Sequence, residues 1–84
     1  MAFKKTNKSE EIKYKVLEEV ATVSEDNGWE LKIRYMSWNG NDPKYDIRKW
    51  KENEDGSERC GKGIGLSGEE MEALTDTLIK IKEN

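Results

Sequence analysis

Residues 29–38 read Trp-Glu-Leu-Lys-Ile-Arg-Tyr-Met-Ser-Trp, the cleanest alternation of apolar and polar side chains in this sequence. Successive side chains of a β-strand point to opposite faces of a sheet, so this stretch predicts a strand with two distinct faces. The odd-numbered face is apolar and is expected to form the core, with Trp29, Leu31, Ile33 and Tyr35. The even-numbered face is mixed, with Glu30, Lys32, Arg34, Met36 and Trp38.

Two more strands are predicted downstream of this stretch. Residues 39–43, Asn-Gly-Asn-Asp-Pro, have the composition of a turn, and alternation resumes over residues 44–52. A second turn at residues 53–56 leads to a glycine-rich strand over residues 58–66. The short turns favour antiparallel pairing of consecutive strands.

One strand is predicted upstream, over residues 12–23. Its alternation slips at Leu17, which indicates a β-bulge. The turn at residues 25–28 ends in Asn-Gly, which favours the positive φ angles of tight hairpins. Residues 1–11 are polar and without period, so we expect a flexible N-terminal tail, with residues 12–84 forming one domain.

A C-terminal helix is predicted to begin at a capping box, in which Ser67 is followed three residues later by Glu70. Its apolar stripe is expected to pack on the odd-numbered face of the sheet, which also takes Tyr45 and Ile47. The predicted fold is therefore α+β, a four-stranded antiparallel meander followed by one C-terminal α-helix. The stripe consists of Met71, Leu74, Leu78 and Ile81.

Composition points to a small protein with a thin core. Apolar types make up 33% and charged types 39% of the 84 residues, and chains of this size are often stabilised by oligomerisation. We therefore expect a homodimer. The single cysteine and the lack of an apolar leader or membrane span predict a cytoplasmic location and no membrane partner. Residues 32–66 form the only basic stretch, with eight basic and six acidic side chains.

Catalytic chemistry is not indicated. The sequence has no histidine, so neither a Ser-His nor a Cys-His pair can form, and the single cysteine, Cys60, is interpreted as a small strand side chain. Residues 63–68 spell G-x-G-x-x-G, but the few residues that follow leave no room for the parallel strand of a dinucleotide fold. We expect no enzyme, no metal and no cofactor, and glycines that permit close backbone approach or a bend.

The even-numbered face is the candidate binding surface. Cations that follow phosphates, interleaved with aromatic rings on which bases stack, are the features of a single-strand binding site. The alternative is that the tryptophans pack on the first strand or seal a dimer interface. Seven residues make up this surface: Lys32, Arg34, Met36, Trp38, Lys44, Arg48 and Trp50.

The order of several short motifs resembles a known family. Tyr45-Asp46-Ile47-Arg48, then Asp55-Gly56, then residues 62–67 and an amphipathic helix are similar to the C-terminal domain of the transcriptional positive cofactor four (PC4-like) family. The stretch from Trp38-Asn39-Gly40 to Asp46-Ile47-Arg48 is especially similar to the compact bacterial YdbC-like branch of that family. The resemblance covers roughly residues 12–82 and implies a curved sheet, a dimer formed through the last strand and helix, and grooves for single-stranded DNA.

The resemblance also implies roles for individual residues. Arg48 and Lys62 match basic residues that contact the DNA backbone, and Trp38 matches a stacking aromatic. Trp50 matches an aromatic position, whereas Lys51 stands where some relatives have a further tryptophan. The nucleic-acid-binding set is Lys32, Arg34, Trp38, Lys44, Arg48, Trp50, Lys51, Arg59 and Lys62. The dimerisation set is Ile64, Leu66, Met71, Leu74, Leu78 and Ile81.

Two functions follow as hypotheses. The first is a homodimeric single-stranded DNA-binding protein with little sequence preference, serving transcription, replication or repair, with RNA as a second possible ligand. The second is a dimeric protein-interaction module that uses the tryptophan-bearing basic face to recognise a polypeptide. The salt dependence of binding separates them, because phosphate contacts release counterions and an apolar interface does not.

Overall fold

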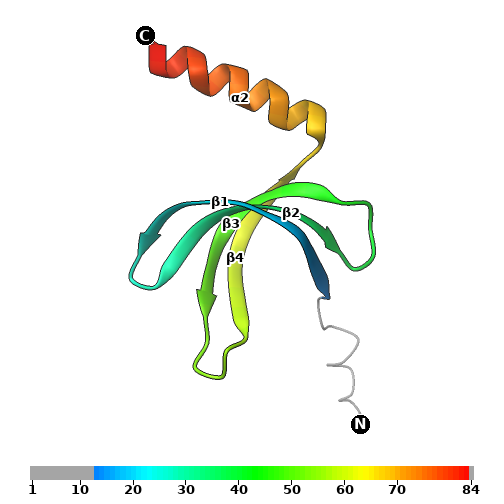
Figure 1. Cartoon of the computed structure of the whole chain (residues 1–84), viewed down its shortest axis with the longest axis vertical. Helices are drawn as coiled ribbons and strands as arrows, with labels where there is room; N and C mark the ends of the chain where they lie inside the picture. The colour runs from blue at the N-terminus through cyan, green and yellow to red at the C-terminus, as the bar shows by residue number, and fades with distance from the viewer. Residues whose placement is uncertain (1–12, 84) are drawn as a thin grey trace.

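The computed structural model describes residues 13–83 and shows four antiparallel strands in one sheet, followed by one helix (Figure 1). The strands are paired in chain order, β1-β2-β3-β4, so the predicted fold class is confirmed. The predicted tail, residues 1–11, lies outside the described residues. The elements are β1 (Tyr14–Asp26), β2 (Trp29–Trp38), β3 (Lys44–Glu52), β4 (Glu58–Leu66) and α2 (Gly68–Glu83).

Tight turns join the first three strands. Asn27 and Gly28 have φ angles of 55° and 84°, and Asn39 and Gly40 have φ angles of 52° and 78°. Asparagine and glycine tolerate the left-handed region better than other residues, which explains why these pairs stand at the turns. The hairpin turns predicted from the sequence are therefore confirmed.

The edge strand β1 contains three irregularities in its pairing with β2. The register shifts between Val16 and Glu18, between Glu19 and Ala21, and between Thr22 and Ser24. Each shift leaves one apolar residue without a cross-strand partner, and a bulge of this kind bends the strand and increases its twist. The predicted bulge at Leu17 is confirmed, and the structure adds two more. The unpartnered residues are Leu17, Val20 and Val23.

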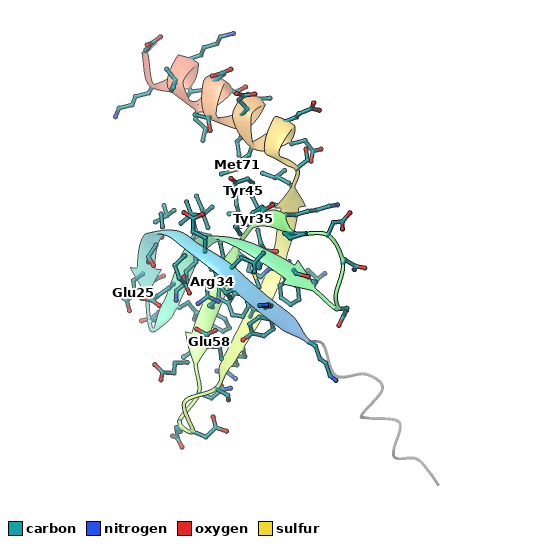
Figure 2. The ribbon with its side chains drawn as sticks, turned by 45° about the vertical axis from the view of Figure 1, so that its right-hand side comes forward. Glu25, Arg34, Tyr35, Tyr45, Glu58 and Met71 are labelled. Atoms are coloured by element: carbon teal, nitrogen blue, oxygen red, sulfur yellow. The ribbon has the colours of Figure 1, made fainter. Side chains whose placement is uncertain are left out.

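The buried core lies on the concave face of the sheet, which carries the even-numbered residues of β2 and β3. Met36 and Trp50 are 1% and 2% exposed, and the charged Arg34 and Asp46 are 3% and 2% exposed. The expectation that the odd-numbered face forms the core is wrong. The convex face remains only half-buried at Leu31, Ile33, Tyr35, Tyr45 and Ile47. Figure 2 shows Tyr35 and Tyr45 on the side of the helix and Arg34 and Glu58 on the opposite side.

The helix α2 begins at the predicted capping box but stands away from the sheet (Figure 1). The Glu70 backbone N–H donates to Ser67 Oγ at 3.1 Å, and the Ser67 backbone N–H donates to Glu70 Oε1 at 2.9 Å. Ser67 alone separates β4 from α2, and the helix axis diverges from the convex face. The expected packing of the stripe on its own sheet is therefore wrong for most of its length, since Leu78 and Ile81 are 53% and 64% exposed.

An apolar cleft separates the helix from the convex face of the sheet. Its volume is about 300 Å³, and both elements contribute to its walls. Met71 and Leu74, at the end of the helix that joins β4, are half-buried. The apolar lining consists of Ile33, Ile47, Met71, Leu74, Leu78 and Ile79.

Candidate nucleic-acid interface

Three aromatic rings from three strands pack together on the concave face. The Tyr14 ring centroid lies 5.3 Å from that of Trp38 and 5.2 Å from that of Trp50. The two indoles are nearly parallel, with an interplanar angle of 12° and centroids 6.1 Å apart. Trp50 is buried, whereas Trp38 and Tyr14 keep part of their surface in solvent. Trp50 therefore supports the cluster from below, and the other two rings are accessible.

Arg34 is fixed by carboxylates from two other strands, and Figure 2 shows one of them, Glu58, on the same side of the sheet as Arg34. Its Nε donates to Glu19 Oε1 of β1 at 3.0 Å, and its Nη2 donates to Glu58 Oε2 of β4 at 3.1 Å. The guanidinium also lies over the Trp50 ring, with Cζ 4.5 Å from the centroid. This pairing neutralises the charge and lets Arg34 be buried beside an indole. Arg34 is thus part of the support of the aromatic cluster.

The same ion pair changes the ionisation of its neighbours. The hydrogen bond from Arg34 lowers the pKa of Glu58. Burial of the carboxylate acts in the opposite direction but is the smaller effect, so the pKa stays below its ordinary value. Burial raises the pKa of Tyr14, and the nearby Glu58 carboxylate raises it further. The Tyr14 hydroxyl donates to Glu58 Oε1 at 3.3 Å, so Glu58 connects the ion pair to the rim of the aromatic cluster.

Asp46 orients both Trp38 and Arg48. The Trp38 Nε1–H donates to Asp46 Oδ2 at 3.1 Å, and Arg48 donates from Nε to Oδ1 at 2.6 Å and from Nη2 to Oδ2 at 2.8 Å. The Arg48 guanidinium lies over the Trp38 ring, with Cζ 4.6 Å from the centroid. A bidentate carboxylate pair restricts the rotamers of an arginine, so Arg48 presents a preorganised cationic plane.

Gly63 makes room for this arrangement. It is paired with Arg48 across β3 and β4, and a Cβ atom at position 63 would lie 2.6 Å from Arg48 Nε and 2.6 Å from the Ile47 carbonyl oxygen. This confirms, for Gly63, the prediction that the glycine-rich strand permits close approach. The G-x-G-x-x-G pattern thus has a packing explanation at this position.

A pocket of about 230 Å³ lies beside the accessible edge of this cluster. Trp38 and Arg48 form part of its wall, and Lys44 adds a second, exposed cation. The pocket offers an aromatic surface, a guanidinium plane and a flexible ammonium group, which suit a base and its phosphate. Its remaining lining consists of Met36, Asn41, Asp42, Asp46 and Gly65.

The nine predicted binding residues are not on one surface. Lys51 and Arg59 lie on the convex face beside Trp29, and Lys62 is exposed at an irregularity of β4. Lys32 lies on the concave face within 3.5 Å of Glu30 and 4.0 Å of Glu58. The residues that share the concave face are Lys32, Arg34, Trp38, Lys44, Arg48 and Trp50.

The expected exposure was wrong for two of these residues. Trp50 and Arg34 are buried because Tyr14 covers the Trp50 ring and Glu19 and Glu58 enclose the guanidinium. The sequence did not predict the roles of Tyr14, Glu19 and Glu58, because alternation within a strand does not show which residues of other strands lie beside it. The one available signal was the even-numbered position of Tyr14 in the alternation of the first strand.

Within residues 13–83, no group of three or more potential ligands could hold a metal ion, and no helix is both long and apolar enough to cross a membrane. Cys60 is a free, exposed thiol whose Sγ lies 3.9 Å from Arg48 Nη1.

The sequence is similar to a protein-family model and to a bacterial protein. The model of the family Transcriptional Coactivator p15 (PC4) matches residues 25–77. A protein of Treponema pallidum (strain Nichols), described as uncharacterized, is 38% identical over 71 residues, which cover 83% of this chain and 80% of that protein. The family resemblance predicted from the motifs is thereby confirmed. The chain belongs to the transcriptional coactivator p15 (PC4) family.

Proposed function

We propose that this protein is a homodimer that binds single-stranded DNA through the concave face, with little sequence preference and without catalysis, in transcription, replication or repair. The observation that carries the proposal is the partly exposed Trp38 ring, held by Asp46 and bordered by Arg48 and Lys44 at one pocket. Membership of a family of transcriptional coactivators supports it. RNA is a second ligand of the same chemistry.

The residues of the site divide into support and contact. Trp50, Arg34 and Asp46 are buried and hold the contact residues in place. Trp38 and Tyr14 offer ring surface to unpaired bases, and Arg48 offers a guanidinium plane on which a base can also stack. Lys44 and Lys62 are exposed and are free to follow phosphates. A stacking surface accepts any base, which accounts for weak sequence preference.

The homodimer is supported by two facing apolar surfaces that one chain does not close. On the side of α2 that lines the cleft and on the convex face of the sheet, Leu78 and Ile64 remain more than half exposed. A second copy related by a two-fold axis would bury this side of α2 and the part of the convex face next to it, around Ile64, with the same residues from each chain. The proposed dimerisation residues are Ile64, Leu66, Met71, Leu74, Leu78 and Ile81.

The salt dependence of binding tests this function. Titration of the protein with fluorescent oligothymidylate at several salt concentrations should give an affinity that falls with a slope of about 0.7 per neutralised phosphate. Trp38→Ala should weaken binding by about five-fold or more at fixed salt and leave the slope unchanged, because stacking releases no counterion. Lys80→Ala, a charge change on α2, is the matched control and should have little effect.

The second candidate function is a dimeric module that recognises a polypeptide through the tryptophan-bearing face. The hydrogen-bonded carboxylates around Arg34 favour it, since they reduce the cationic charge available to phosphates. Affinity for oligothymidylate that does not change with salt, or no binding at all, would favour this function over the first.

A further inference from the structure

A row of directly paired residues crosses the sheet at the end remote from α2. Trp29 of β2 is paired with Lys51 of β3, and Lys51 is paired with Arg59 of β4. Both cations lie near the same indole, with Lys51 Nζ 5.8 Å and Arg59 Cζ 5.5 Å from the centroid of the Trp29 ring. The row therefore combines an aromatic ring with two cations on the convex face, opposite to the Trp38 pocket.

The ring of Trp29 borders a hollow in the surface. A pocket of about 310 Å³ is lined by Trp29, Lys49 and Gly61, together with Asp26 and Asn27. Lys49 is exposed and adds a third cation beside the row. The single acidic group of this lining is Asp26, which is paired with Trp29 across β1 and β2.

Charges at this end of the sheet are segregated by face. On the concave face, Glu25 is paired with Glu30, and Glu52 is paired with Glu58. The cation there, Lys32, is already close to two of these carboxylates. A nucleic-acid strand that left the Trp38 pocket along the concave face would therefore meet four carboxylates, of which Glu30 and Glu58 already have cationic partners, whereas the convex face at the same end presents cations.

We infer that the Trp29 row is a second contact for the same nucleic-acid strand, with one base on the Trp29 ring and phosphates at Lys51 and Arg59. This inference rests on the proposed function. Trp29 and Trp38 stand nine residues apart on β2, about 30 Å at the usual rise per strand residue. The nucleic-acid strand would reach the convex face across the edge strand β4, where Gly61 and Gly63 carry no side chain and the exposed Lys62 between them can contact a phosphate.

Oligonucleotide length separates the two contacts. The parent and a Trp29→Leu variant are titrated with fluorescent oligothymidylates of about 6 and about 20 nucleotides, one near the lower end of the site sizes of single-strand binding domains and one above their upper end. The variant should bind the long ligand about five-fold or more weakly and the short ligand as tightly as the parent does. Trp29→Phe should restore most of the affinity, because it keeps an aromatic ring.

The cations provide a second variant that does not alter the half-buried indole. Lys51→Gln combined with Arg59→Gln should lower the salt slope for the long ligand by about 1.4 and leave that of the short ligand unchanged. Lys80→Gln is the control for charge. The second contact would be overturned if the variants changed the binding of both ligands equally or of neither. It would also be overturned if sedimentation showed a change in oligomeric state as their only effect. Failure of the parent to bind either ligand would instead refute the proposed function.

Discussion

Replacement of Arg34 by alanine tests whether this side chain supports the site or contacts the ligand. The Arg34 side chain is 3% exposed, donates to Glu19 and Glu58, and lies over Trp50. Breaking a buried ion pair costs about 3–5 kcal/mol when the remaining charge stays buried. Here the two glutamates are 58% and 30% exposed and can be rehydrated, so the cost falls to the lower end, about 3 kcal/mol.

Urea unfolding at one fixed protein concentration measures this cost, and a salt titration of oligothymidylate binding measures the phosphate contacts. Arg34→Ala should lower the free energy of unfolding by about 3 kcal/mol and leave the salt slope unchanged. Lys44→Ala is the matched cation and should do the reverse, with stability unchanged and a slope lower by about 0.7. An Arg34→Ala variant as stable as the parent, with a slope reduced like that of Lys44→Ala, would refute a supporting role.

Three further variants test other parts of the structure. Gly63→Ala should cost about 1–3 kcal/mol of stability in urea unfolding because its Cβ would press on Arg48, whereas Gly61→Ala, with open space around it, should cost much less. Leu78→Glu should shift sedimentation equilibrium from dimer towards the 9.7 kDa monomer; an unchanged dimer would argue against this surface. The pKa of Glu58 is lowered in the folded state, so its ionised form stabilises the fold at pH values above its ordinary pKa of 4.5. This stabilisation is lost as the pH falls through the lowered pKa. The difference in thermal midpoint between the parent and Glu58→Gln should therefore shrink on acidification, and a constant difference would contradict the ion pair.

Local sequence signals predicted the elements well. The strands over residues 29–38, 44–52 and 58–66 have the bounds that alternation and turn composition predicted. The helix begins directly after the Ser67 capping box, because that motif is decided within four residues. The first strand was less well predicted, since three bulges replace a period of two with an irregular one.

The sequence alone did not predict which face of the sheet is buried. Alternation divides β2 into two faces, but which face is buried depends on partners from distant strands. Arg34 can be buried because Glu19 and Glu58 reach it from β1 and β4, which are 15 and 24 residues away in the chain. The apolar face was expected in the core for its composition, yet α2 diverges from it.

The candidate site was predicted only in part, because its contacts also involve several strands. The alternation of even and odd positions correctly placed Trp38, Lys44 and Arg48 on one face, and the structure brings Trp38 and Arg48 into direct contact. Alternation along β3 also indicates that Lys51 belongs to the other face, but the resemblance grouped it with the first set. Arg59 joins Lys51 on that face because the pairing of β3 with β4 is irregular between Arg48 and Trp50, and a glycine-rich strand specifies its register weakly.

The most direct test of single-strand binding is a paired titration of the parent protein with one oligonucleotide, single-stranded and as a matched duplex, at the same salt concentration. Base pairing hides the ring faces that Trp38 and Tyr14 need, whereas the phosphates remain available in both ligands. The single strand should therefore bind more tightly and quench tryptophan fluorescence. Equal or tighter binding of the duplex, without quenching by the single strand, would contradict a stacking site on the concave face.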